Sequence, residues 1–170
     1  MLAIFLDTKN EIVRIEQECR GLERKMELYR KERDEEVKDS HASAMATIAH
    51  GIYNGVENVL KDIVRYFDGN LPTGSDWHTK LLVRAHNPNP GVREAIISED
   101  TAKVLGDLKS FRHIFRGIYQ SSFVPEKVVV MARQTLGTIP VVIKEIETFM
   151  TNCAGEDSSP DQTRRDIPGL

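Results

Sequence analysis

Apolar residues recur at alternating intervals of three and four along most of this chain, and this period most restricts the folds it can adopt. The first such stripe consists of Ile12, Ile15, Cys19, Leu22, Met26 and Tyr29. A spacing of three and four places side chains on one face of an α-helix, whereas a half-buried strand alternates every second residue. We therefore predict one long helix over residues 7–38, with the charged residues on its solvated faces.

A broader apolar face predicts a second helix from about Ser40 to Phe67. Its members are Met45, Ile48, Ala49, Ile52, Val56, Val59, Leu60 and Ile63. Gly51 and Gly55 lie four residues apart on one side of this helix, a spacing that lets another backbone come close. The stretch D-G-N-L-P-T-G-S-D then ends the helix, because glycine and proline both interrupt helical backbone.

Two shorter helices are predicted after this break. Ser75 or Asp76 can cap a helix over residues 77–86, and N-P-N-P-G ends it. The next helix begins near Ser98, where S-E-D-T supplies a capping hydroxyl and early acidic residues. The buried stripe of that helix is predicted to be Val104, Leu108, Phe111, Phe115 and Ile118.

A last helix is predicted from Pro125 to about Asn152, with a kink at Pro140. Residues 153–170 are polar and rich in glycine, proline and serine, which predicts a disordered tail. No segment shows a convincing strand alternation. The fold class is therefore all-α, an up-and-down helical bundle with a long N-terminal helix, in one domain over residues 1–152.

Composition limits the classes of function. The chain of 170 residues suits one core, and its net charge of −3 implies no partner by itself. No apolar stretch approaches the roughly 18 residues of a membrane span, and the start lacks the features of a signal peptide. Cys19 and Cys153 lie far apart, and the histidines form no H-x-x-x-H pair. We predict a cytoplasmic protein with reduced thiols, no metal site and no cofactor.

The stretch S-F-R-H-I-F-R-G-I-Y-Q places several ionisable groups beside an apolar stripe. On an ideal helix Arg116 lies about 40° from Arg112, and Tyr119 lies about 20° to the other side. Lys109 adds to the same locally basic segment. Arginine offers a rigid fork of donors, so this face suits a phosphate. The alternative is a set of arginines at a helix–helix boundary or a dimer contact.

Residues 112–119, R-H-I-F-R-G-I-Y, resemble the signature of the HEPN superfamily. That signature is an arginine, a polar residue, three further residues and a histidine, and in the HepT-like toxin branch a tyrosine follows two places later. The stretches I-Y-N-G-V-E-N-V-L-K-D-I at 52–63 and D-G-N-L-P-T-G-S-D-W-H-T-K-L-L at 68–82 also resemble that branch. The three blocks stand in the right order, so the resemblance covers most of residues 5–150.

The resemblance implies a helical, metal-independent ribonuclease toxin that works as a homodimer and is encoded beside a nucleotidyltransferase antitoxin. By this likeness Arg112 would hold the scissile phosphate, and His113 would support the site by hydrogen bonding. Tyr119 matches the tyrosine that the antitoxin modifies with AMP. Arg116 and Lys109 are candidates for contacts with RNA phosphates.

Gly117 departs from the family pattern, because the motif has a histidine at this position. Glycine cannot transfer a proton, so the chain as given is predicted to be inactive. Three explanations compete: an inactivating substitution, a degenerate relative that only binds RNA or the nucleotidyltransferase, or replacement by another residue such as His113. A purely structural dimeric helical protein is the remaining alternative.

Four residues of the two upstream blocks are candidates for the same site. Asn54 and Glu57 could face the site, although a helix-packing hydrogen bond for Asn54 and a surface charge for Glu57 are the simpler interpretations. His78 is interpreted as a surface residue in the first turn of its helix. Trp77 is interpreted as a core residue in preference to a platform for base stacking.

Overall fold

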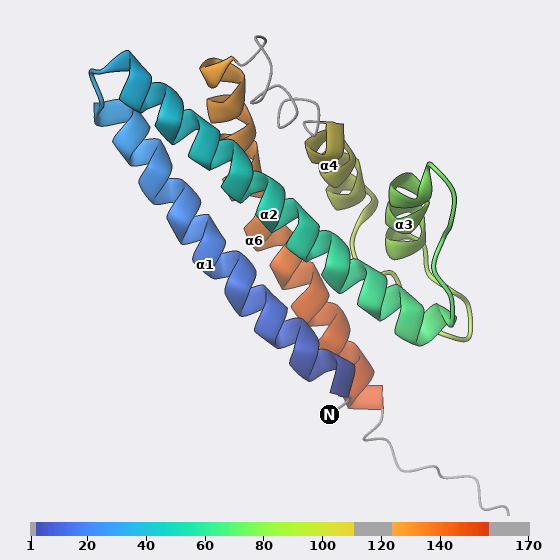
Figure 1. Ribbon diagram of the computed structural model, residues 1–170. Coiled ribbons are helices and arrows are strands. Elements are labelled where there is room, and N and C mark those ends of the chain that lie inside the picture. The colour runs from blue at the N-terminus through green and yellow to red at the C-terminus, as the bar shows by residue number, and fades with distance from the viewer. Residues whose placement is uncertain (1–2, 111–123, 157–170) are drawn as a thin grey trace, which may run out of the picture.

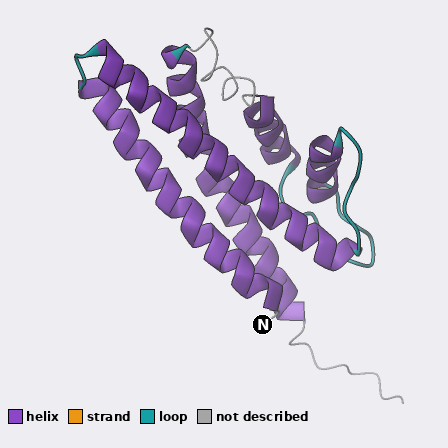
Figure 2. Ribbon diagram, in the orientation of Figure 1, coloured by secondary structure: helices purple, strands orange, loops and turns teal. Residues whose placement is uncertain are grey.

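The described residues form a bundle of helices. A computed structural model of the chain describes residues 3–110 and 124–156 (Figure 1). Within these ranges there are five helices and no β-strand (Figure 2). They are α1 (Ala3–Lys31), α2 (Glu35–Asp68), α3 (Trp77–His86), α4 (Glu99–Ser110) and α6 (Pro125–Glu156). The predicted all-α bundle is confirmed.

The three long helices make the body of the molecule. Helices α1 and α2 form an antiparallel hairpin, and α6 packs against both of them (Figure 1). The short helices lie on one side of this body, with α3 against α2 and α4, and α4 also against α6. The predicted apolar stripes of α1 and α2 point into the core, where Leu22, Met45 and Ile52 are completely buried.

The boundary between the first two helices differs from the prediction. Helix α1 ends at Lys31, and α2 begins at Glu35, so the predicted helix over 7–38 is two helices joined by a short turn. The cause is a cap: the side chain of Asp34 accepts hydrogen bonds from the backbone N–H groups of Glu36 and Val37. Two acidic residues in the first turn further favour this start.

The predicted close approach at the α2 glycines is confirmed. A Cβ atom at Gly55 would lie 2.9 Å from Cγ1 of Ile15. A Cβ atom at Gly51 would lie 2.6 Å from a carboxylate oxygen of Glu18. Both neighbours belong to α1, so the two glycines let the hairpin close tightly.

Other helix predictions were partly right. Helix α3 spans the predicted residues, although Asp76 stands at its N-cap without a side-chain cap and pairs with Lys80 instead. Ser98 caps α4 as predicted, through a hydrogen bond of 3.2 Å from the N–H of Thr101. The predicted burial of Val104 is wrong, because Leu105 is the residue that is fully buried.

The last helix is longer than predicted. Helix α6 runs through Pro140 and continues past Asn152 to Glu156, so the first part of the predicted tail is helical. The remainder of that tail prediction, over 157–170, lies outside the described residues, as do Phe111, Phe115 and Ile118 of the predicted α4 stripe.

A buried arginine fixes the loop between α3 and α4 to the end of α2. Nε and Nη2 of Arg93 donate to the two carboxylate oxygens of Asp68, at 2.8 and 2.9 Å. The other donors of this guanidinium reach the backbone carbonyls of Arg84, Asn87 and Glu94. Burial would raise the pKa of Asp68, but the hydrogen bonds and charge of Arg93 outweigh it and hold that pKa below its usual value.

Candidate functional site

The predicted motif lies between α4 and α6. Arg112, His113, Arg116, Gly117 and Tyr119 all fall in 111–123, outside the described residues, so their predicted roles stay predictions. The candidate site is therefore built here from its described neighbours. These are the end of α4, which leads into the motif, and the parts of α2 and α3 that carry the two upstream blocks.

Helix α2 carries a polar stripe in its otherwise apolar inner face. It consists of His50, Tyr53, Asn54 and Glu57, at intervals that place all four on one side of the helix. Nδ2 of Asn54 lies 3.1 Å from Nε2 of His50, and the hydroxyl of Tyr53 donates to Oε1 of Glu57 at 3.2 Å. The stripe thus contains two hydrogen-bonded pairs, His50 with Asn54 and Tyr53 with Glu57.

The stripe continues onto α3 through a carboxylate–imidazole pair. Oε1 of Glu57 contacts Nδ1 of His78 across the two helices. The interpretation of Glu57 as a surface charge is wrong, because only 7% of this residue is exposed. The interpretation of His78 as a surface residue is wrong for the same reason, since its side chain is 13% exposed. Two separately interpreted polar residues thus form one buried pair.

Trp77 closes the outer side of this pair. Its ring stacks on that of His78, with centroids 3.6 Å apart, and Nζ of Lys61 lies 5.2 Å from the Trp77 ring centroid. The tryptophan is half-buried and packs against the core, which confirms its interpretation as a core residue. With both of these neighbours against its ring, Trp77 is poorly placed to stack on a nucleobase.

Lys109 connects the end of α4 to the start of α3. Its Nζ donates to Oγ1 of Thr79 at 2.9 Å. Thr79 follows His78 directly, so this bond places the last turn of α4 beside the turn of α3 that carries the buried pair. Arg112 follows Lys109 by three residues in the sequence. The last described turn of α4 therefore lies next to the Glu57–His78 pair.

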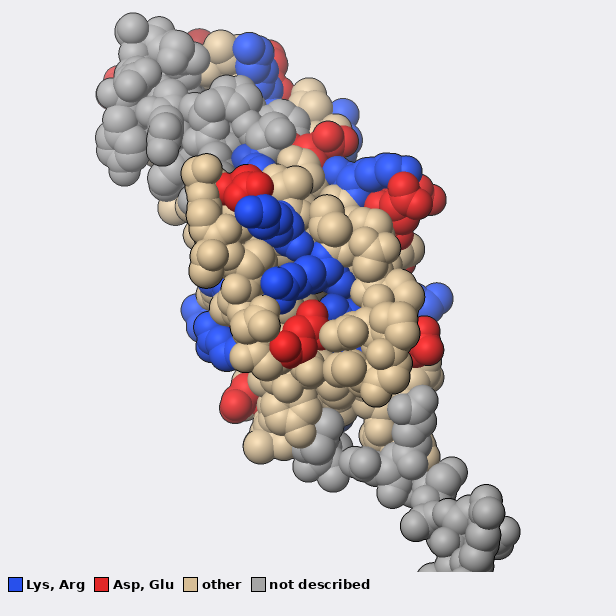
Figure 3. All heavy atoms as spheres, turned by 90° about the vertical axis from the view of Figure 1, so that its right-hand side faces the viewer, with Lys and Arg blue, Asp and Glu red and all other residues tan. Residues whose placement is uncertain are grey.

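The face made by the short helices is rich in basic side chains. Figure 3 shows Lys and Arg gathered across the middle of the side of the molecule on which α3 and α4 lie. Helices α3 and α4 contribute Lys80, Arg84, Lys103 and Lys109. Lys80 and Lys103 pair with carboxylates of their own helices, whereas Lys109 bonds a neutral hydroxyl. Arg84 likewise bonds neutral groups, the backbone and side-chain oxygens of Asn70. Lys109 and Arg84 are thus the basic residues here that most readily serve an incoming anion.

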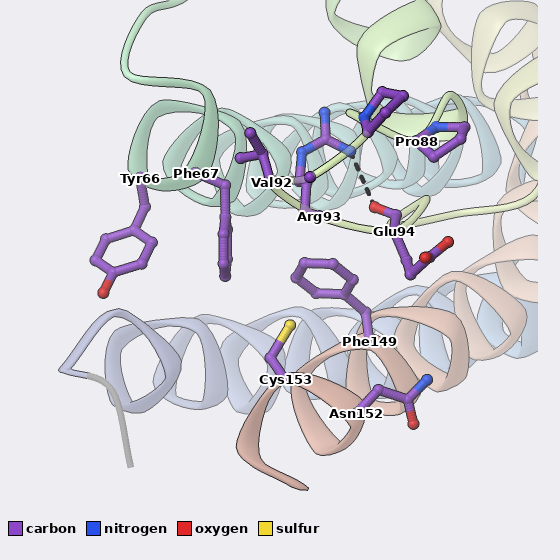
Figure 4. Close-up of a pocket in the computed structure, with 11 residues that line it drawn as sticks. Tyr66, Phe67, Pro88, Val92, Arg93, Glu94, Phe149, Asn152 and Cys153 are labelled. Carbon is purple, nitrogen blue, oxygen red and sulfur yellow. Dashed lines mark hydrogen bonds between the residues drawn. The ribbon is translucent and has the colours of Figure 1, made fainter. Parts of the chain in front are cut away.

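A separate cavity of about 470 Å³ lies at the other end of the bundle. The ends of α2 and α6 and the loop before α4 line it, with Phe67, Phe149 and Val92 prominent (Figure 4). Arg93 borders the cavity, but its donors already bind Asp68 and backbone carbonyls, including that of Glu94. None of its described lining residues belongs to the predicted motif.

The described residues show neither a metal-binding cluster nor a membrane-spanning helix. In residues 3–110 and 124–156, no group of three or more histidine, cysteine or acidic side chains is arranged to hold a metal ion. No helix in those same ranges has the length and apolarity that crossing a membrane requires.

Comparison with known proteins identifies the class. The sequence over residues 44–153 matches the model of the family described as HepT-like protein. The chain belongs to this family, within the HEPN superfamily, so the resemblance seen in the sequence is confirmed. No curated protein and no solved structure gives a significant match.

Proposed function

We propose that this chain is the ribonuclease component of a toxin–antitoxin system, present in a form that has lost its proton-transfer residue. The observation that carries the proposal is the family match, which spans the two upstream blocks and the whole motif over 112–119. The basic face of α3 and α4 supports it, because RNA phosphates bind best to surfaces of this charge (Figure 3).

The proposed reaction is a metal-independent transesterification of RNA. Arg112 binds the scissile phosphate and stabilises its developing negative charge, with Arg116 and Lys109 contacting neighbouring phosphates. A histidine at position 117 transfers a proton during cleavage, and His113 supports the motif by hydrogen bonding. With Gly117 in that position, the chain binds RNA and does not cut it.

Regulation is proposed to act on the same motif. A nucleotidyltransferase-type antitoxin adds AMP to Tyr119, and the added bulk and charge block RNA from the arginines. The active form is a homodimer in which two copies of the motif face one shared substrate. A monomer in light scattering at micromolar concentration would contradict this part of the proposal.

A second candidate function rests on Gly117 itself. If glycine is the natural residue, the protein is a non-catalytic binding module that captures RNA or the nucleotidyltransferase without turnover. Reading codon 117 in the source genome distinguishes a natural glycine from an introduced one.

The decisive experiment compares the protein carrying Gly117 with its Gly117→His variant on a mixed tRNA and mRNA pool in EDTA. Only the histidine variant should cut, and Arg112→Ala in that background should abolish cutting. RNA binding by the protein as given should weaken steeply as salt rises. Absence of Arg112-dependent cleavage by the Gly117→His variant would refute the ribonuclease proposal, and persistent RNA binding would then favour the binding module.

A further inference from the structure

The guanidinium of Arg84 on α3 is fixed in position, although only part of it is bonded. Its Nη1 donates to the backbone carbonyl of Asn70 at 3.1 Å and to the side-chain Oδ1 of the same residue at 2.7 Å. Within residues 3–110 and 124–156, Nε and Nη2 of Arg84 have no hydrogen-bonding or ionic partner. This edge of the guanidinium is therefore available to a ligand.

The same edge of a neighbouring arginine shows what such a group binds. Nε and Nη2 of Arg93 donate to the two carboxylate oxygens of Asp68, at 2.8 and 2.9 Å. Two parallel bonds from this edge match the oxygens of a carboxylate or of a phosphate. Arg93 has no donor left, since its Nη1 and Nη2 also bind backbone carbonyls. The equivalent edge of Arg84 thus suits an oxyanion that comes from outside the chain.

Arg84 and Arg93 line a hollow of about 350 Å³ between the turn after α2 and the loop after α3. Its charged lining residues are these two arginines and Asp68, so its formal charge is positive. The carboxylate of Asp68 is already bonded by Arg93 and by Nδ2 of Asn89, so it opposes an incoming anion only weakly. The remaining polar lining residues are neutral amides: Asn70, Asn87 and Asn89. The hollow is therefore suited to an anion.

The hollow lies at one end of the basic face made by α3 and α4 (Figure 3). Arg84 is in the last turn of α3, and Lys109 meets the first turn through its bond to Thr79 at 2.9 Å. Between them Lys80 lies on the same side of α3 as Arg84, and it neutralises Asp76. Thr79 and Arg84 are separated by about 7.5 Å along the helix axis. Successive phosphates of one strand can span this separation, whereas a single small anion cannot.

We propose that Arg84 binds a phosphate of the RNA backbone in this hollow and that Asn70 positions its guanidinium. This role rests on the proposed ribonuclease function and deepens it, because it names a subsite for the substrate outside residues 112–119. The RNA strand follows α3 from Lys109 to Arg84. A free nucleotide carries the same phosphate chemistry, but the basic face that leads to the hollow favours the polymer. Phosphate contacts carry no sequence information, so the subsite adds affinity for any RNA.

The test measures binding of labelled transfer RNA to the full-length protein carrying Gly117, at salt concentrations between about 50 and 200 mM. Arg84→Ala should weaken binding by roughly 10-fold at the lowest salt, as the loss of a hydrogen-bonded charge contact predicts. The slope of log affinity against log salt should fall by about 0.7 to 0.9, the contribution of one phosphate. Arg84→Lys should restore most of the slope but only part of the affinity, because lysine lacks the edge with two donors.

Two further variants separate this contact from general effects of charge and structure. Arg14→Ala is the matched control, because it removes an arginine from α1, which lies on the opposite side of α2 from α3 (Figure 1). Arg14 pairs with Glu11 at 3.1 Å, and its loss should leave the slope unchanged. Asn70→Ala should weaken binding less than Arg84→Ala does, and it should have no further effect in the Arg84→Ala protein. A purely structural role for Asn70 would weaken binding by both proteins equally.

Either of two results would overturn this role for Arg84. One is the absence of RNA binding by the protein carrying Gly117, and the other is an unchanged salt slope in an Arg84→Ala protein that circular dichroism shows to be folded. In the second case, calorimetry with AMP shows whether the hollow takes a free nucleotide instead. Cleavage of RNA by the Gly117→His variant tests the proposed function separately. Cleavage with an unchanged slope would remove only the subsite, whereas a changed slope without cleavage would remove only the ribonuclease activity.

Discussion

Replacing Arg93 with alanine should lower the free energy of unfolding by about 3–5 kcal/mol, the usual effect of breaking a buried ion pair from one side. The arginine side chain is 1% exposed and that of Asp68 is 9% exposed. Besides the two bonds to Asp68, the guanidinium donates to three backbone carbonyls, at 2.9 to 3.1 Å. The variant leaves the Asp68 carboxylate with one side-chain donor, Nδ2 of Asn89 at 3.3 Å, and removes the guanidinium from these carbonyls, although entering water offsets part of the loss.

Urea unfolding followed by circular dichroism measures this change directly. Arg65→Ala is the matched control, because Arg65 pairs with Asp62 at 3.5 Å on the surface of α2, the helix that ends at Asp68. The control should change the free energy of unfolding by less than about 1 kcal/mol. If Arg93→Ala also costs less than about 1 kcal/mol, water replaces the guanidinium fully. The hydrogen bonds of Arg93, which join the end of α2 to the loop before α4, would then contribute little to stability.

Three further predictions follow from the bundle. The pKa of Asp68 is lower in the folded state, so the stability it contributes is present above its ordinary value of 3.8 and is lost as pH falls below it. Asp68→Asn should flatten this acid dependence in urea titrations. Gly55→Ala should lower the free energy of unfolding, because its Cβ atom would lie 2.9 Å from Ile15. Gly137→Ala, where the added Cβ atom meets open space, should raise the free energy of unfolding by about 1 kcal/mol. Burial, aided by Glu23, raises the pKa of the Cys19 thiol to about 11. At pH 8 this thiol should therefore react with a disulfide reagent roughly 100-fold more slowly than an ordinary thiol. The rate is measured in a Cys153→Ser background, so that only Cys19 reacts.

The sequence predicted the helices well because their signals are local. The stripes of α1 and α2 needed only the intervals between apolar residues, and every position predicted for those two stripes is buried or packs against the core. The boundary at Asp34 was missed because the predicted apolar stripe ends at Tyr29 and does not mark where the first helix stops. A capping aspartate followed by two glutamates, D-E-E, was the available signal.

The Glu57–His78 pair could not be predicted in the same way. Each residue is unremarkable in its own helix, and the contact depends on how α3 folds back onto α2 after the turn at 69–76. The motif gave no help, because spacing along one helix says nothing of which other helix packs beside it. An indirect signal did exist, since four polar residues interrupt the apolar face of α2 between residues 50 and 57.

That interruption is informative because it conflicts with the rest of the helix. Elsewhere the inner face of α2 is apolar, and replacing the polar stripe with apolar residues would retain the fold without the desolvation of a carboxylate. Polar residues on a buried helix face are unfavourable for the core, and they are expected mainly where function requires them. The stripe pairs with His78 of α3, and the next residue, Thr79, bonds Lys109 in the last turn of α4. The conflict therefore favours a functional role for the polar stripe of α2 and for the His78 side chain that pairs with it.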